Sequence, residues 1–164
     1  MNIRKGFTLI ELLVVIAIIG VLSTLAVVSF QGAREKGRDA VRLSDIKSVQ
    51  TALELYYTDK TYYPFSAALL AAQVLGEGNY KCLGGTPTNG FLASACIDPV
   101  YMAKVPADPS ASSGTDYKYT SNATGSAYGI EFVPETTGNS LIKGSIYCAK
   151  PGGVIDTGAC SIPN

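Results

Sequence analysis

An apolar run near the N-terminus limits what this chain can fold into more than any other feature. Between Phe7 and Gln31 the only ionisable side chain is that of Glu11. An apolar stretch of about 18 residues or more is long enough to cross a bilayer as a helix, and this one is too aliphatic for an amphipathic surface helix. The sequence therefore predicts a transmembrane helix over residues 7–30 in a single-pass membrane protein.

A secretory signal peptide and a signal anchor are two alternative interpretations of this run. A signal peptide has an apolar core of about 7–15 residues before a small-x-small cleavage site, whereas this run is longer and continues into the next predicted helix. Counting Lys and Arg alone would place the C-terminal part in the cytoplasm. We place it on the oxidising side instead, because it contains four cysteines.

The composition argues against nucleic-acid binding and against most kinds of catalytic site. The chain has 13 basic and 13 acidic residues, a net charge of +0, and no His. Binding to phosphates needs a basic excess, and His is the commonest general base and metal ligand. No Gly-x-Ser-x-Gly motif and no Gly-rich phosphate loop is present. We predict no catalytic residues; an exported enzyme or sugar-binding module is the alternative class.

The residues before the apolar run form a recognisable motif. Residues 1–12 read MNIRKGFTLIEL, which resembles the type III signal of the type IV pilin and pseudopilin family. The resemblance implies that residues 1–6 are a leader peptide, that prepilin peptidase cleaves between Gly6 and Phe7, and that Phe7 becomes the N-methylated N-terminus. Gly20 also matches the family, whereas Val27-Val28 lacks a proline that many members carry.

Glu11 is the candidate residue for assembly. A carboxylate inside a membrane span costs about 2.5–3.5 kcal/mol on insertion scales, so such a residue is a functional candidate. After cleavage the α-amine of Phe7, with a reference pKa of about 7.7–8.0, would be cationic. That amine could neutralise Glu11 of its own or a neighbouring chain, and in the family this pairing sets the axial register. The alternative is a Glu that only reaches the membrane interface.

The helix is predicted to continue beyond the apolar run as an amphipathic segment over residues 31–63, and to end before Pro64. Leu43, Ile46, Leu53 and Tyr56 recur at three- and four-residue spacing and form an apolar stripe. The charged residues form mixed-sign pairs that suit either a solvated face or a subunit contact. They are Arg34, Glu35, Arg38, Asp39, Arg42 and Asp45.

Residues 64–164 are predicted to form a globular pilin head domain. A short helix is predicted over residues 67–75, and a three-stranded meander over 117–121, 127–133 and 140–148. The apolar stripe of the long helix would supply the core that a small sheet lacks by itself. The expected fold class is α+β, a type IV pilin-like fold with one long N-terminal helix on a small antiparallel sheet with disulfide-stapled loops.

Four cysteines lie in the predicted head domain. An even number in an exported domain indicates two disulfides, with three pairings open. Proximity in sequence favours Cys82 with Cys96 and Cys148 with Cys160. A four-cysteine metal site is the alternative, but no Cys-x-x-Cys spacing supports it, so we predict no metal site.

Residues 105–109 and 117–119 resemble the equivalent stretch of major pseudopilins of type II secretion. Those proteins often bind calcium, so the resemblance raises calcium as a cofactor, although we favour none. The candidate ligands are scattered and lack EF-hand spacing, which suits ordinary turn residues better; they are Asp98, Asp108, Asp116 and Asp156. Asn122-Ala123-Thr124 matches a glycosylation acceptor pattern.

The function we favour from sequence is a structural one. The chain is predicted to be a prepilin that polymerises into a type IV pilus-like surface filament after leader cleavage and N-methylation. The alternative is a pseudopilin of a type II secretion system. Expected partners are identical or related pilin subunits, prepilin peptidase, the assembly platform and its ATPase, and membrane lipid before assembly, with no specific nucleic acid. The expected location is the inner membrane for the precursor and the cell surface for the filament.

Overall fold

One long helix, α1 (Leu9–Lys60), is by far the longest secondary-structure element of the described residues. The computed structural model describes residues 6–65, 72–85, 90–94, 96–110, 115–138 and 140–162, with the side chain at position 28 excluded. The helix has 52 residues. It ends at Lys60, earlier than the expected end before Pro64, because Thr61 adopts a left-handed backbone with φ of 66°. Helices commonly end at such a residue.

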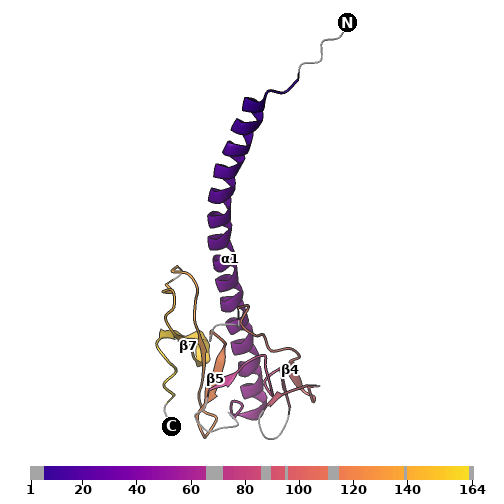
Figure 1. Ribbon diagram of the computed structural model, residues 1–164. Coiled ribbons are helices and arrows are strands. Elements are labelled where there is room, and N and C mark those ends of the chain that lie inside the picture. The colour runs from indigo at the N-terminus through magenta and orange to yellow at the C-terminus, as the bar shows by residue number, and fades with distance from the viewer. Residues whose placement is uncertain are drawn as a thin grey trace. The chain divides into compact units, whose positions relative to one another are not determined.

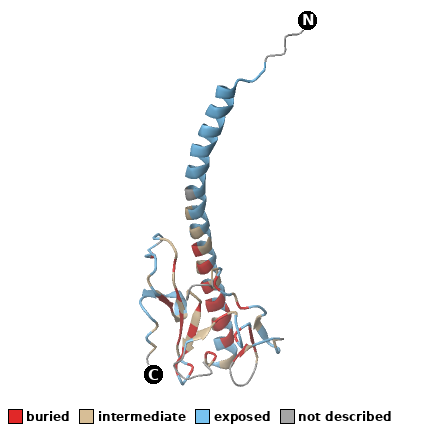
Figure 2. Ribbon diagram, in the orientation of Figure 1, coloured by how far each residue is buried: buried red, intermediate tan, exposed pale blue. Residues whose placement is uncertain are grey.

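The chain divides into two compact units, Met1–Gly37 and Arg38–Asn164. The described part of the first unit is mostly the apolar half of α1, whose large side chains are exposed (Figure 2). This half contains an 18-residue window apolar enough to cross a membrane, none of it buried inside the protein. Length and composition therefore fit the predicted single membrane span.

The second unit, which we call the head unit, combines the C-terminal half of α1 with two antiparallel sheets (Figure 1). The larger sheet has five strands in the order β1-β5-β6-β7-β8. A 3₁₀ turn, η2 (Pro151–Gly153), leads into its last strand. The strands are β1 (Gln73–Val74), β5 (Lys118–Ser121), β6 (Tyr128–Phe132), β7 (Tyr147–Ala149) and β8 (Ile155–Thr157).

A smaller sheet of three strands lies in the segment between β1 and β5. Its order is β3-β2-β4, and its strands are short: β2 (Cys82–Gly84), β3 (Phe91–Leu92) and β4 (Val100–Met102). The sequence did not predict this sheet. Runs of two or three residues are too short to display the alternation on which strand prediction depends.

The core of the head unit forms where α1 packs on the sheets. Ile46, Leu53 and Tyr56 are completely buried and Leu43 packs against the core half-buried, which confirms the predicted apolar stripe. Buried residues in β5 and β6, and Tyr117 just before β5, complete the core; those in the strands include Tyr119, Tyr128 and Ile130.

Two local predictions need correction. The helix expected over residues 67–75 is wrong at its C-terminal end, because Gln73–Val74 is strand β1 paired with β5; residues 66–71 lie outside the described part. The third strand expected over 140–148 is confined to Tyr147–Ala149. The residues before it form turns, with Ser140 at a φ of 65°, which a continuing strand does not accommodate.

Candidate functional site

Glu11 caps the helix that contains it. Its Oε2 atom accepts hydrogen bonds from the Thr8 backbone N–H at 2.8 Å and from the Thr8 hydroxyl at 2.7 Å. The Glu11 backbone N–H in turn lies 3.3 Å from the Thr8 hydroxyl. This reciprocal arrangement is a capping box, which satisfies donors that a helix N-terminus leaves free. The capping box was not among the features predicted from sequence, although Thr8-x-x-Glu11 is its signature.

The capping box leaves part of the Glu11 carboxylate open. Within the described residues, no hydrogen bond to its Oε1 atom is observed. Phe7, just before the helix, is exposed, as is Gly6. The structure therefore brings Glu11 to the first turn of α1 with one oxygen accessible, while leader residues 1–5 lie outside the described part.

A buried ion-pair network, the Arg42 network, lies where α1 enters the head unit. Arg42 is completely buried, with 0% of the residue exposed. Its Nε and Nη2 atoms donate to the two carboxylate oxygens of Asp108 at 2.7 and 2.9 Å. Its Nη1 atom donates to Asp39 Oδ1 at 2.7 Å, and Nη2 also reaches Glu135 Oε1 at 2.5 Å. One guanidinium thus joins the helix to two distant loops.

The acidic members of the Arg42 network have further donors. Asp39 accepts hydrogen bonds from the backbone N–H groups of Glu135 at 2.9 Å and Thr136 at 2.8 Å. Glu135 is also paired with Arg38, whose Nε atom donates at 2.9 Å. Asp108 accepts the Ser110 backbone N–H at 2.7 Å. Each carboxylate is held by at least two donors, as buried charges require.

These contacts change the pKa values of the acids. Hydrogen bonds from Arg38 lower the pKa of Glu135 to about 2, from an ordinary 4.5, with burial opposing and Arg42 adding to the effect. Burial raises the pKa of Asp108, but hydrogen bonds from Arg42 and Ser110 outweigh it and bring the pKa below its ordinary value. Burial raises the pKa of Asp39 as well, but hydrogen bonds from Thr136, Glu135 and Arg42 together outweigh it and bring the pKa below its ordinary value.

The Arg42 network corrects one expectation. Arg38, Asp39 and Arg42 were expected on a solvated face or at a subunit contact, yet Asp39 and Arg42 are buried inside the head unit. A signal for this was present in the sequence. Arg42 precedes Ile46 by four residues, and so extends the apolar stripe by one turn toward the N-terminus.

The four cysteines form two disulfides. Cys82 is bonded to Cys96, and Cys148 to Cys160. The first closes a loop that contains β2 and β3, and the second bonds β7 to the C-terminal tail. Both pairs are those that proximity in sequence favoured. Each constrains the unfolded chain and so stabilises the fold by about 2–4 kcal/mol in typical cases.

Three of the four acids that were candidates for calcium have separate surroundings. Asp108 is bound to Arg42, Asp156 pairs with Lys150 at 2.8 Å, and Asp98 is exposed. Over the described ranges, no group of three or more His, Cys, Asp or Glu residues could hold a metal ion.

Asn122, the candidate glycosylation residue, is 2% exposed and organises the turn between β5 and β6. Its Oδ1 atom accepts the backbone N–H of Ser126 at 2.9 Å, and its Nδ2 atom donates to the Ser126 hydroxyl at 2.7 Å. The side chain is therefore a turn-forming residue in the folded protein, and it is not accessible to a glycan transferase.

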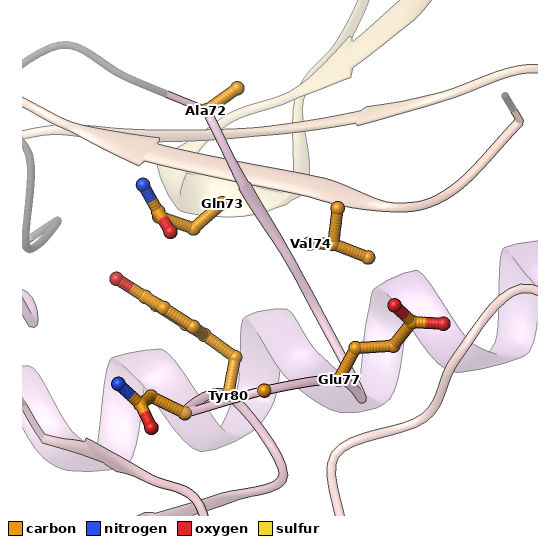
Figure 3. Close-up of a pocket in the computed structure, with 7 residues that line it drawn as sticks. Ala72, Gln73, Val74, Glu77 and Tyr80 are labelled. Atoms are coloured by element: carbon orange, nitrogen blue, oxygen red, sulfur yellow. The ribbon is translucent and has the colours of Figure 1, made fainter.

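The cavities of the head unit are shallow. One of about 410 Å³ lies between β1 and the turn before β2, where the Tyr80 ring points toward Gln73 (Figure 3). Its charged lining residue is Glu77. A single carboxylate without a nearby nucleophile or base does not resemble a catalytic constellation.

Comparison with known proteins identifies similar sequences. Residues 1–27 match the prokaryotic N-terminal methylation motif. The chain is 34% identical over 127 residues to type II secretion system core protein G of Escherichia coli (strain K12), covering 77% of this chain and 79% of that protein. It is 35% identical over 115 residues to the protein of the same name from Pectobacterium carotovorum subsp. carotovorum, covering 70% and 65%. The Klebsiella pneumoniae protein is 33% identical over 99 residues, covering 60% and 71%. No solved structure matches significantly.

Proposed function

Since the chain belongs to the type IV pilin and pseudopilin family, with type II secretion system core protein G among its relatives, we propose that it is the pseudopilin of a type II secretion system. The family consists of structural subunits that assemble with related subunits, so the chain is not an enzyme. The surface pilus favoured from sequence becomes the second interpretation, because the named relatives belong to secretion systems.

The observation that carries this proposal is the extent of the similarity to core protein G. The match covers 77% of this chain, far more than the methylation motif alone. It therefore includes a large part of the head unit. We propose no cofactor for assembly, and calcium remains only an expectation from the resemblance.

Assembly would proceed from the N-terminus of α1. Prepilin peptidase would cleave between Gly6 and Phe7, and the Phe7 amine would be methylated while the apolar half of α1 is held in lipid. The open Oε1 atom of Glu11 supports the next step, since it can accept a hydrogen bond from the cationic amine of a neighbouring copy. The assembled subunit would lie in the periplasm, with the assembly platform and its ATPase as partners.

Deletion of the gene in its native host separates the two interpretations. For a pseudopilin, exported proteins should accumulate inside the cell envelope and disappear from the medium, and a plasmid-borne copy should restore them. The readout is quantitative proteomics of medium and periplasm. Normal secretion together with loss of sheared surface filaments would support the surface pilus instead.

A further inference from the structure

Two surfaces of the head unit expose large aliphatic side chains. On α1, Leu55 is 56% exposed and Val41 is 47% exposed. In the loop between β6 and β7, Ile142 is 57% exposed and Ile146 is 43% exposed. Large aliphatic side chains that a polymerising subunit leaves exposed are candidates for protein–protein contact.

The first surface, the helix surface, is a line of exposed residues along the part of α1 that belongs to the head unit. Its members are uncharged and follow the three- and four-residue spacing of one helix face: Val41, Ser44, Ser48, Thr51, Leu55 and Thr58. The hydroxyls of Ser48, Thr51 and Thr58 each donate to the carbonyl four residues earlier at 2.9 Å. Covering this surface would therefore leave these three donors satisfied, which keeps the cost of desolvation low.

The second surface, the loop surface, consists of Ile142 and Ile146. Internal hydrogen bonds hold the backbone around it. The Ile142 N–H donates to the Tyr147 hydroxyl at 2.7 Å, and the Gly144 N–H to the Pro134 carbonyl at 2.9 Å. A loop that is already ordered loses little conformational entropy when it binds, which favours its use as a contact.

A filament needs two different surfaces on every subunit. Its repeating contact is heterologous, because one patch on a copy meets another patch on the next, and the contact does not close into a ring. The helix surface lies on the same helix as the apolar segment through which, in the proposed function, the chain assembles with related subunits. It is therefore continuous in the chain with an assembly interface, whereas the loop surface is a separate patch of matching apolar character.

We propose that the loop surface of one copy packs on the helix surface of the next copy in the assembled filament. This inference rests on the proposed function, because it requires that the chain polymerises. It goes further by naming both halves of a contact between head units. Ile142 and Ile146 supply the apolar anchors, and the uncharged face from Val41 to Thr58 receives them.

Photo-crosslinking in assembled material tests the contact directly. A benzophenone amino acid placed at position 142 should give dimers whose linked peptides join position 142 of one copy to residues 41–58 of another. The matched control carries the probe at position 97, because Ile97 is also 57% exposed but lies outside both surfaces. That probe should not label residues 41–58.

Links from position 142 to the apolar half of α1, to lipid or to a secreted protein would overturn the contact while leaving the proposed function intact. Absence of any assembled wild-type material would overturn the proposed function and the contact with it. The two failures are therefore distinguishable.

A pair of variants gives a second readout. The Ile142→Glu variant should lower the yield of pelletable filaments by about tenfold or more, the change that follows from a loss of about 1.4 kcal/mol at the contact. The Ile97→Glu variant should stay close to wild type, since it adds the same charge at the same exposure. Equal yields of the two variants, whether high or low, would overturn the contact.

Discussion

A Cβ atom on Gly129 would lie only 2.4 Å from the Sγ atom of Cys160. Gly129 belongs to β6, and the disulfide between Cys148 and Cys160 passes directly over it. The Cys160 backbone N–H is fixed nearby by Glu131 Oε1 at 2.8 Å. The absence of a side chain at position 129 therefore provides the space in which the C-terminal tail crosses the sheet and is bonded to β7.

We expect the Gly129→Ala substitution to destabilise the head unit and to impair closure of this disulfide. Overpacking costs about 1–3 kcal/mol, and loss of a disulfide from a small exported domain about 2–5 kcal/mol. Thermal unfolding of the full chain in detergent and thiol counting by mass spectrometry measure the two effects. Gly138→Ala is the matched control, since a Cβ there meets nothing within 4 Å. Equal stability of the two variants would contradict the prediction.

Arg42 should be the charged residue whose loss destabilises the head unit most. Removing one partner of a buried ion pair costs about 3–5 kcal/mol, because the remaining charge stays buried and unpaired. We expect this loss for Arg42→Met in denaturant unfolding of the full chain in detergent. Arg42→Lys should recover only part of it, since one ammonium cannot pair with both Asp108 oxygens as the guanidinium does.

The exposed Arg34 offers the control for this experiment. Arg34→Met removes the same charge and adds the same side chain outside the head unit, so its free energy of unfolding should stay within about 0.5 kcal/mol of wild type. An Arg42→Met variant as stable as Arg34→Met would show that the network contributes no net stability.

The Arg42 network also predicts a loss of stability in acid. Hydrogen bonds from Arg38 hold the pKa of Glu135 at about 2, below its ordinary 4.5, and the pKa values of Asp39 and Asp108 are lowered as well. A carboxyl with a lowered pKa in the folded state stabilises the fold above its unfolded pKa. That contribution disappears as the pH falls through the folded pKa.

We therefore expect the free energy of unfolding to fall as the pH decreases from about 4.5 toward 2. Asp45 opposes this trend, because burial raises its pKa despite a hydrogen bond from Tyr117 at 3.1 Å. Equilibrium unfolding at a series of pH values measures the slope. The Glu135→Gln variant should show a shallower slope over this range; an unchanged slope would exclude Glu135 as a contributor.

The sequence predicted the parts of the fold that local patterns encode. The long helix follows from an apolar run and a stripe without proline, so α1 could be predicted almost to its end. The smaller sheet could not, because β2 (Cys82–Gly84) is buried along its whole length and shows no alternation. Pairing of such short strands depends on tertiary contacts rather than on pattern.

The same limit applies to the candidate sites. Glu11 could be identified because it is a charged residue within an apolar run. The pattern Thr8-x-x-Glu11 also indicates its capping role, but that role was not predicted. The Arg42 network was not predictable in full, since Asp108 lies 66 and Glu135 lies 93 residues beyond Arg42. Only the fold brings these loops to one turn of α1.

The two roles of Glu11, capping its own helix and pairing with a neighbouring amine, can be separated by substitution. Glu11→Gln keeps a carbonyl oxygen that can accept the Thr8 N–H but removes the charge that would attract the Phe7 amine. We expect normal membrane insertion and cleavage, with filament yield reduced by about tenfold or more, as loss of a charge-assisted contact of about 1.4 kcal/mol would produce.

Thr8→Ala is the complementary variant, because it keeps the carboxylate but removes the hydroxyl of the capping box. Loss of such a cap costs about 0.5–2 kcal/mol of helix stability, so we expect local fraying with filament yield closer to wild type. Mass spectrometry of the N-terminus confirms that both variants are cleaved and methylated at Phe7, and pelleting of sheared or detergent-released material measures assembly. Normal yield from Glu11→Gln with a reduced yield from Thr8→Ala would reverse the assignment: Glu11 would then act only as a helix cap.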